Sequence, residues 1–140
     1  MPETAAREDD LQATEARNLA TLERMAAAFN ARDVEAILSN FHEEGVFDTS
    51  QGPDPWGQRF TGRNEIRVAV EGVFTSLPDI HFENHARWVC GDRGVTEWTC
   101  TATTPKGHPM EVRGCDLFEF HEGQVTRKDT YFKQVLRKKA

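Results

Sequence analysis

The chain has 140 residues and a formal net charge of −6 at pH 7, so it suits one domain with a single hydrophobic core. The negative charge disfavours nucleic acid and anionic membranes as partners, although residues 137–140 form a short basic tail. The first ten residues are polar and acidic, unlike a secretory signal peptide, and no apolar run reaches the length of a membrane span.

We expect residues 1–9 to be a disordered lead-in because they are polar and lack apolar periodicity. The folded domain is then expected to cover residues 10–136, followed by the basic tail at 137–140. The three cysteines, widely spaced and without a C-x-x-C motif, are typical of reduced thiols rather than of a disulfide framework or a zinc site. They indicate a cytoplasmic protein.

The first half of the domain is predicted to be mainly helical. From residue 10 to about residue 29, apolar residues recur every three or four positions, which predicts an amphipathic helix. Asp33 caps a second, shorter helix. Residues 45–49 are a candidate strand, residues 50–58 have the composition of a loop, and residues 62–77 predict a third helix.

The second half is predicted to be four long strands joined by short turns. They cover residues 80–90, 95–104, 109–120 and 124–134, and the last turn lies at His121–Gly123. Helices followed by a meander of strands predict an α+β fold, with a curved antiparallel sheet and helices on its concave face. Such a cone encloses a natural cavity.

Two aspartates are candidates for proton transfer. Because strand side chains alternate between faces, Asp116 shares a face with Phe118 and Phe120. An unpaired carboxylate among apolar groups is costly, so Asp116 needs either a structural partner, such as backbone amides or an arginine, or a function. Asp48 ends a strand before a polar loop, where an aspartate often caps a turn. If both acids face one apolar cavity, one can stay protonated while the other acts as a base.

Other side chains are candidates for contact with a ligand. Trp98 and Cys100 share a strand face, although a tryptophan in mid-strand is typical of a core. Trp56, in the polar loop, either fills the edge of the core or covers the pocket. Lys128 shares a strand face with Thr130 and Phe132, but a lysine there is typical of a solvent-exposed charge.

No metal ion or cofactor is expected. His81 and His85, four residues apart on a predicted strand, would lie about 13 Å apart, too far for one metal ion. The other histidines are scattered, and the sequence has no G-x-S-x-G motif, phosphate loop or dinucleotide fingerprint.

Several short motifs, taken in order, resemble the nuclear transport factor 2-like superfamily in its SnoaL-like and ketosteroid isomerase-like branch. The resemblance covers residues 15–134. It implies a cone-shaped, cystatin-like α+β barrel, a hydrophobic pocket and commonly a homodimer formed through the outer face of the sheet. The motifs are NARDVEAI at 30–37, GVFD at 45–48, FTG at 60–62, PD at 78–79 and GCDLFEF at 114–120.

The resemblance also suggests roles for the two acids. Asp48 matches the general base of the steroid isomerases. Asp116 matches both the protonated aspartate of their oxyanion hole and the acid/base aspartate of SnoaL-like cyclases. The oxyanion-hole tyrosine of the isomerases falls on Met25, which cannot donate a hydrogen bond, and losing one such donor costs about a hundredfold in rate or more. Isomerisation of a 3-keto steroid by that mechanism is therefore not expected.

The catalytic residues of two other enzyme classes in the superfamily are not matched at the corresponding positions of this chain. The arginine and two aspartates of limonene-epoxide hydrolases fall on Trp98, Cys100 and Thr130, which excludes that reaction. A histidine of the cyclases falls near Thr104, and His108 lies past the following turn.

The sequence therefore leaves three hypotheses. The first is a cofactor-free enzyme in which Asp48 and Asp116 catalyse isomerisation, cyclisation or dehydration of a small hydrophobic carbonyl compound. The second is a non-catalytic, ligand-binding or accessory dimer, and the third is a protein-interaction module. The expected ligand-contact residues are Met25, Trp56, Trp98, Cys100, Phe118, Lys128, Thr130 and Phe132.

Overall fold

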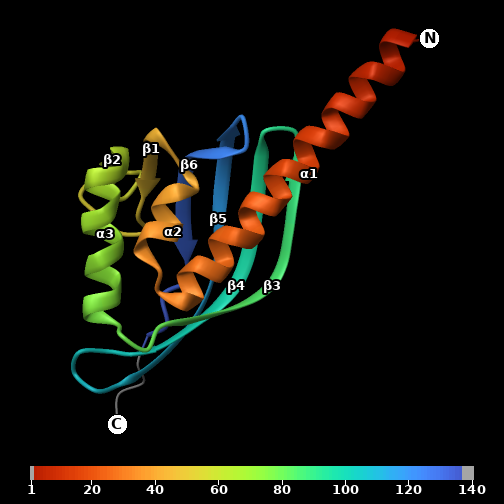
Figure 1. Ribbon diagram of the computed structural model, residues 1–140. Coiled ribbons are helices and arrows are strands. Elements are labelled where there is room, and N and C mark those ends of the chain that lie inside the picture. The colour runs from red at the N-terminus through yellow and green to blue at the C-terminus, as the bar shows by residue number, and fades with distance from the viewer. Residues whose placement is uncertain (1, 137–140) are drawn as a thin grey trace.

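The computed structural model describes residues 2–136, with side chains from Arg7 onward, and confirms the predicted α+β fold. The helices are α1 (Pro2–Ala31), α2 (Val34–Ser39) and α3 (Gly62–Ser76). The strands are β1 (Phe41–Asp48), β2 (Arg59–Thr61), β3 (His81–Cys90), β4 (Arg93–Thr103), β5 (Pro109–His121) and β6 (Gln124–Phe132). Figure 1 shows the helices in front of one curved sheet. We call the face of the sheet that the helices cover the inner face, and the opposite face the outer face.

The six strands form one sheet in the order β2-β1-β6-β5-β4-β3. The pairs are antiparallel except β1 with β6, which is parallel. The expectation of a purely antiparallel sheet was therefore wrong for this pair. Helix α3 and four strands separate β1 from β6 in the sequence, and such a long connection is what a parallel pair requires. Strand β2 was not predicted, because its three residues are too few to show periodicity.

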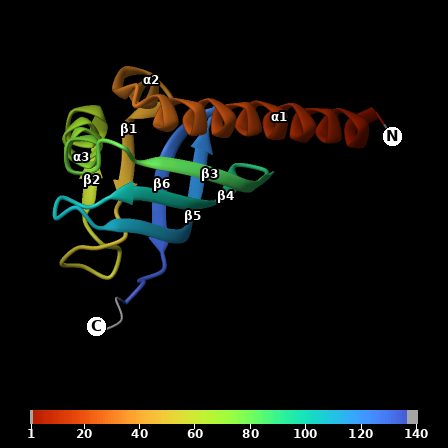
Figure 2. The same cartoon turned by 90° about the horizontal axis from the view of Figure 1, so that it is seen from below.

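Helix α1 is longer than predicted. It begins at Pro2 and so includes residues 2–9, for which we expected disorder. These positions are rich in Ala, Glu and Arg, which favour helix even where periodicity is absent. Figures 1 and 2 show the N-terminal part of α1 extending past the sheet, and Leu11 in this part is 50% exposed. Within residues 2–136, no helix combines the length and apolar character needed to cross a membrane.

Two hairpin turns fix the rest of α1 across the inner face. Asn18 donates from Nδ2 to the carbonyl oxygen of Gly91 at 3.0 Å, in the β3–β4 turn. Thr21 donates from Oγ1 to the carbonyl oxygen of Gly123 at 2.6 Å, in the β5–β6 turn. Glu122 and Gly123 have positive φ angles of 50° and 80°, as a tight hairpin turn requires. The predicted turn at this place is confirmed.

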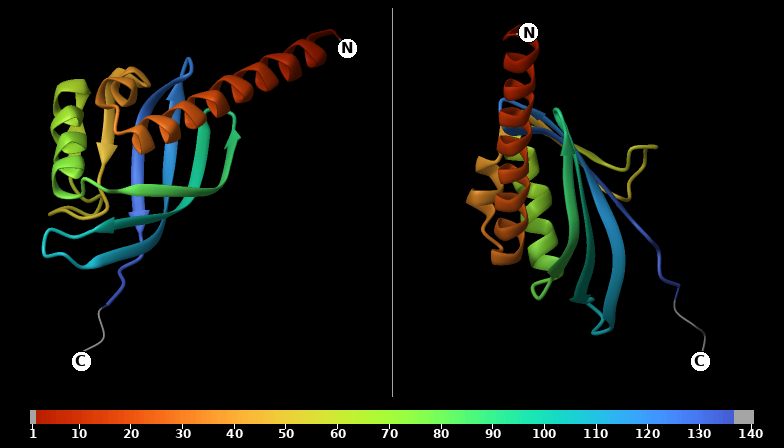
Figure 3. Two further views of the ribbon diagram at one scale, coloured as in Figure 1. Left: turned by 60° about the horizontal axis from the view of Figure 1, so that its bottom comes forward. Right: turned by 90° about the vertical axis from the view of Figure 1, so that its right-hand side faces the viewer.

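The core fills the space between the helices and the inner face. From α1, Leu22, Met25 and Phe29 are buried in one cluster with Phe118 and Phe120. Helix α3 adds two fully buried side chains, and all three helices lie on one side of the sheet (Figure 3). The loop of residues 50–58, yellow in Figure 3, projects to the opposite side.

Strand β5 contains a glycine that allows a tryptophan to pack closely. Gly114 is paired with Trp98 of β4. A Cβ atom at position 114 would come within 2.5 Å of the Trp98 Cη2 atom and 2.6 Å of the Tyr131 carbonyl oxygen. Only glycine therefore leaves room for the indole ring.

We predict that Gly114→Ala lowers the free energy of unfolding by about 1–3 kcal/mol, because the added methyl group must displace the indole or the β6 backbone. Gly72→Ala is the matched control. A Cβ atom at that exposed position of α3 meets no atom within 4 Å, so the same change should raise the free energy of unfolding by about 0.5–1 kcal/mol. Urea unfolding measures both. Equal stability of the Gly114→Ala variant and the parent would contradict the packing described.

Candidate functional site

A small cavity lies between α1 and the inner face of the sheet. Its volume is about 30 Å³, enough for about one or two water molecules and far below the roughly 300–1,000 Å³ of most ligand pockets. Most of its wall is apolar, with Leu22, Met25, Ala26 and Phe29 from α1 and Phe82 and Phe118 from the sheet. The polar part of the wall consists of Asn84, Thr96, Trp98, Asp116 and Lys128.

Asp116 is 6% exposed and accepts hydrogen bonds from four side chains. Trp98 Nε1 donates to Oδ2 at 2.9 Å, and Thr96 Oγ1 donates to the same oxygen at 3.2 Å. Lys128 Nζ at 2.9 Å and Thr130 Oγ1 at 2.6 Å donate to Oδ1. A carboxylate has about four acceptor sites, so these four bonds satisfy both of its oxygens. The acid among aromatic residues thus has a charged partner, which is a lysine rather than the arginine we considered.

Lys128 is buried, so the expectation of a solvent-exposed charge was wrong. Its side chain is on the inner face, and the residue is 6% exposed. Nζ lies 4.4 Å from the centroid of the Phe47 ring and 5.0 Å from that of Phe29, distances at which an ammonium group is attracted to an aromatic face. Nζ also donates to Thr130 Oγ1 at 2.9 Å. The pair with Asp116 is therefore a buried ion pair in a mostly apolar wall.

A bulge in the β5–β6 pairing decides which residues of β6 face inward. Phe120 pairs with Val125, but Glu119 pairs with Arg127, so Thr126 is an extra residue. Without this shift, Arg127 would lie opposite Phe118, where Lys128 lies. A β-bulge of one residue reverses the faces of the strand beyond it. The bulge therefore puts Lys128, rather than Arg127, beside Asp116.

Asp48 lies on the outer face, so the expectation that it shares a cavity with Asp116 was wrong. Its neighbour Phe47 is in the inner core, and adjacent strand residues point to opposite faces. Asp48 is fully buried and accepts two hydrogen bonds from Arg59, Nε to Oδ1 at 2.8 Å and Nη2 to Oδ2 at 2.9 Å. Arg127 Nε lies 3.3 Å from Oδ2. The adjacent Phe47 was the sequence signal that could have indicated this orientation.

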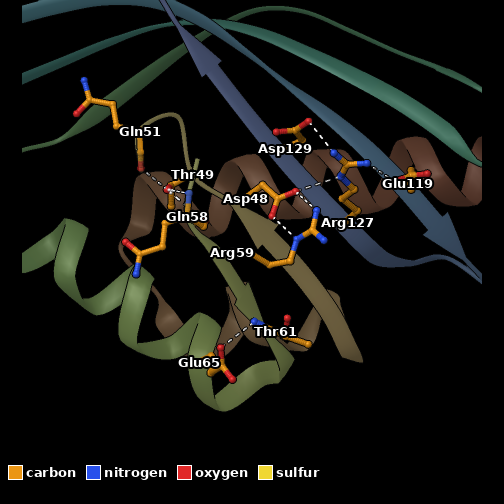
Figure 4. A network of polar contacts seen from close by, with 10 residues as sticks. All are labelled: Asp48, Thr49, Gln51, Gln58, Arg59, Thr61, Glu65, Glu119, Arg127 and Asp129. Atoms are coloured by element: carbon orange, nitrogen blue, oxygen red, sulfur yellow. Dashed lines mark hydrogen bonds and ion pairs between the residues drawn. The ribbon is translucent and has the colours of Figure 1, made fainter. Parts of the chain in front are cut away.

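The Asp48 network extends over the outer face (Figure 4). Arg127 also pairs with Asp129 at 3.1 Å and with Glu119 at 3.5 Å. The hydrogen bonds with Asp48 raise the pKa of Arg59. Trp56 is 44% exposed, and the guanidinium of Arg59 lies 5.4 Å from the centroid of its ring. Trp56 therefore belongs to the outer face, and the prediction that it contacts a ligand in the cavity was wrong.

Four of the other predicted contact residues lie at the cavity or directly behind its wall. Met25, Trp98 and Phe118 line the cavity. Thr130 is not part of the wall, but it is hydrogen-bonded to both Asp116 and Lys128.

Cys100 and Phe132 do not reach the cavity, and both predictions were wrong. Cys100 is buried in a second core cluster with Ile80 and Val112, where burial raises its pKa to about 11. Phe132, at the end of β6, is 40% exposed and borders a surface depression beside Lys133. Cys100 lies four residues along β4 from Thr96, which pairs with Asp116, and Phe132 is the last residue of β6. Alternation assigns a residue to a face but does not give its position relative to the cavity.

The sequence prediction missed two polar residues of the cavity wall. Thr96 is on the same strand face as Trp98, so alternation could have identified it. Asn84 precedes a register shift between Asn84 and Ala86 in the β3–β4 pairing. Asn84 donates from Nδ2 to the Phe82 carbonyl oxygen in a long hydrogen bond of 3.5 Å. Asn84 is therefore well placed to hydrogen-bond a molecule in the cavity.

Comparisons with known proteins agree with this fold. Residues 22–128 match the family model of the SnoaL-like domain. No curated protein matches the sequence closely enough to count as a relative.

Three solved structures serve as examples of the same fold. A candidate SnoaL-like polyketide cyclase from Jannaschia sp. CCS1 is 17% identical, with a TM-score of 0.75 over 85% of this chain and 87% of that one. A candidate polyketide cyclase from Xanthomonas campestris pv. campestris is 22% identical, with a TM-score of 0.76. The match covers 86% of this chain and 93% of that one. TerC, co-crystallised with polyporic acid, is 23% identical, with a TM-score of 0.72. The match covers 84% of this chain and 92% of that one. At these identities the likeness establishes the fold alone.

We predict that Asp48→Asn lowers the free energy of unfolding by about 1–3 kcal/mol, because two guanidinium groups lose their anion. The loss stays below that of a fully buried pair because both arginine side chains remain partly exposed to water. Glu35→Gln, which breaks the exposed pair with Arg67, is the control and should leave the melting temperature nearly unchanged. Thermal unfolding compares the two. An equally small effect of both changes would show that the outer network does not stabilise the fold.

Proposed function

This chain belongs to the SnoaL-like domain family, and we propose that its inner cavity binds a small, mostly apolar carbonyl compound on which Asp116 moves a proton. The observation that carries this proposal is the Asp116–Lys128 pair, buried and hydrogen-bonded in the wall of a mostly apolar cavity. Carboxylates so placed are candidates for acid/base chemistry. No cofactor is needed for such a transfer.

The chemistry follows from the charges of the two side chains. With the carbonyl oxygen of the ligand near Lys128 Nζ, the ammonium group stabilises the negative charge that develops on that oxygen. Asp116 then removes a proton from the carbon next to the carbonyl group and returns it to another atom of the ligand. Isomerisation, cyclisation and dehydration of carbonyl compounds all use such a step.

The cavity must widen to admit a ligand larger than a few atoms. Met25 lines it where the steroid isomerases have a tyrosine, and a methionine is flexible enough to make room. Asn84 supplies a second polar contact at the wall, which suits a ligand with a second polar group. The co-crystallisation of TerC with polyporic acid supports small-molecule binding by this fold.

A non-catalytic binding role is the alternative, and one observation favours it. Asp116 already accepts four hydrogen bonds, about as many as a carboxylate has acceptor sites, which leaves little of it free to take a proton from a ligand. In that role the same pair would hold the ligand without reacting with it.

A homodimer formed through the outer face remains part of the proposal. Trp88 is 47% exposed and Tyr131 is 54% exposed. Trp88 borders an apolar surface depression with Val95 and Leu117 of the neighbouring strands. Exposed aromatic and aliphatic side chains of this kind are typical of a protein interface.

We predict that the protein accelerates the exchange of the α-hydrogens of small cyclic ketones for deuterium, a reaction that requires only a base and a stabilised oxyanion. Cyclohexanone and 1-tetralone are suitable probes, and proton NMR in deuterium oxide measures the rate. Asp116→Asn should reduce the acceleration on the order of a hundredfold.

Asp48→Asn is the matched control, because the same change is made on the outer face, where it should leave the acceleration of the folded protein intact. Circular dichroism confirms that both variants are folded. Equal rates in the parent and the Asp116→Asn variant would rule out Asp116 as the base. Binding of the ketones without any exchange would instead support the non-catalytic role.

A further inference from the structure

Lys128 differs from the other lysines that the structure describes. Lys106 and Lys133 are exposed, whereas Lys128 is 6% exposed and lines the cavity. Its Nζ atom lies between two aromatic rings and 2.9 Å from Asp116 Oδ1. An amine in an apolar site, next to a group that can take its proton, is the arrangement in which lysine acts as a nucleophile.

The ionised pair is stable only while its surroundings stabilise both charges. When an apolar ligand displaces water from the cavity, both charges become more costly. The proton of Lys128 can then move along the 2.9 Å hydrogen bond to Asp116. This transfer leaves a neutral amine beside a carboxylic acid, with no charge buried at either group. The lone pair that remains on Nζ at first points toward Asp116, and rotation about the Cε–Nζ bond turns it toward a ligand in the cavity.

We propose that Lys128 forms an imine with a small aldehyde or ketone in the cavity. This inference rests on the proposed function, since it takes the same ligand class in the same site. The Nζ lone pair attacks the carbonyl carbon, the carbon–oxygen π bond breaks, and the oxygen takes the proton held by Asp116. The product is a carbinolamine, and Asp116 is again a carboxylate.

The second half of the reaction releases water. Asp116 takes a proton from the nitrogen and passes it to the hydroxyl group, which leaves as water while the carbon–nitrogen double bond forms. Overall, an ammonium group and a carbonyl compound give a protonated imine and water, so no oxidant or reductant is required. The positively charged imine then withdraws electrons from the neighbouring carbon, which makes a proton on that carbon easier to remove. The steroid isomerases activate their carbonyl compound with a hydrogen-bond donor, whose position corresponds to Met25 here.

Reductive trapping tests this proposal. The protein is incubated with acetaldehyde or acetone, small carbonyl compounds that need little widening of the cavity, together with sodium cyanoborohydride, which reduces an imine to a stable amine. Peptide mass spectrometry then measures labelling at each lysine. Lys128 should be labelled about tenfold faster than Lys106 and Lys133, although it is the least exposed of the three. Labelling confined to the exposed lysines and the N-terminus would overturn the proposal.

Lys128→Arg separates the covalent role from an electrostatic one. Arginine keeps the positive charge but forms no imine with these probes. The covalent mechanism predicts loss of deuterium exchange in this variant, whereas an electrostatic role predicts that exchange continues. If Lys128→Arg does not fold, trapping in the parent protein decides alone. Exchange that depends on Asp116 without trapping at Lys128 would leave the proposed function standing and remove the imine.

Discussion

The ion pair between Asp116 and Lys128 is the interaction on which the rest of the site depends. Each side chain is buried at a cost that its charged partner helps to offset, and removing either would leave the opposite charge unpaired in a mostly apolar wall. The pair also joins separate parts of the fold. Asp116 comes from β5 and Lys128 from β6, while Phe29 of α1 and Phe47 of β1 contact the ammonium group. The chemistry of the cavity is therefore built into the packing of the core.

Each face of the sheet carries a buried aspartate paired with basic side chains, but the surroundings of the two aspartates differ. On the inner face, one acid and one amine meet in the mostly apolar wall of the cavity. On the outer face, Asp48 is enclosed by Arg59 and Arg127, and the network continues to Asp129. Its charges are mutually neutralised, and the two arginines are partly open to water. That arrangement stabilises an edge of the sheet and offers no cavity for a substrate.

Much of the fold could be predicted from local patterns in the sequence. Three-to-four-residue periodicity located α1 and α3, alternation with turn residues located the meander, and Asp116 was correctly placed on the face of Phe118 and Phe120. The side chains opposite it could not be predicted, because the extra residue Thr126 reverses the faces of β6 beyond it. A bulge of this kind depends on pairing between strands, which has no signal within one strand. Asp48 was misplaced for a different reason, since the resemblance to the isomerases outweighed the simple alternation with Phe47.

The central claim is that a carbonyl compound binds at the inner pair. A crystal structure of the protein soaked with cyclohexanone tests it most directly. We expect the ketone between α1 and the sheet, with its α-carbon facing Asp116. Its oxygen should lie about 3 Å from Lys128 Nζ, or its carbonyl carbon should be bonded to that atom. A ketone found only on the outer face beside Asp48, or an inner cavity that stays filled by Met25 and water at saturating ketone, would contradict it.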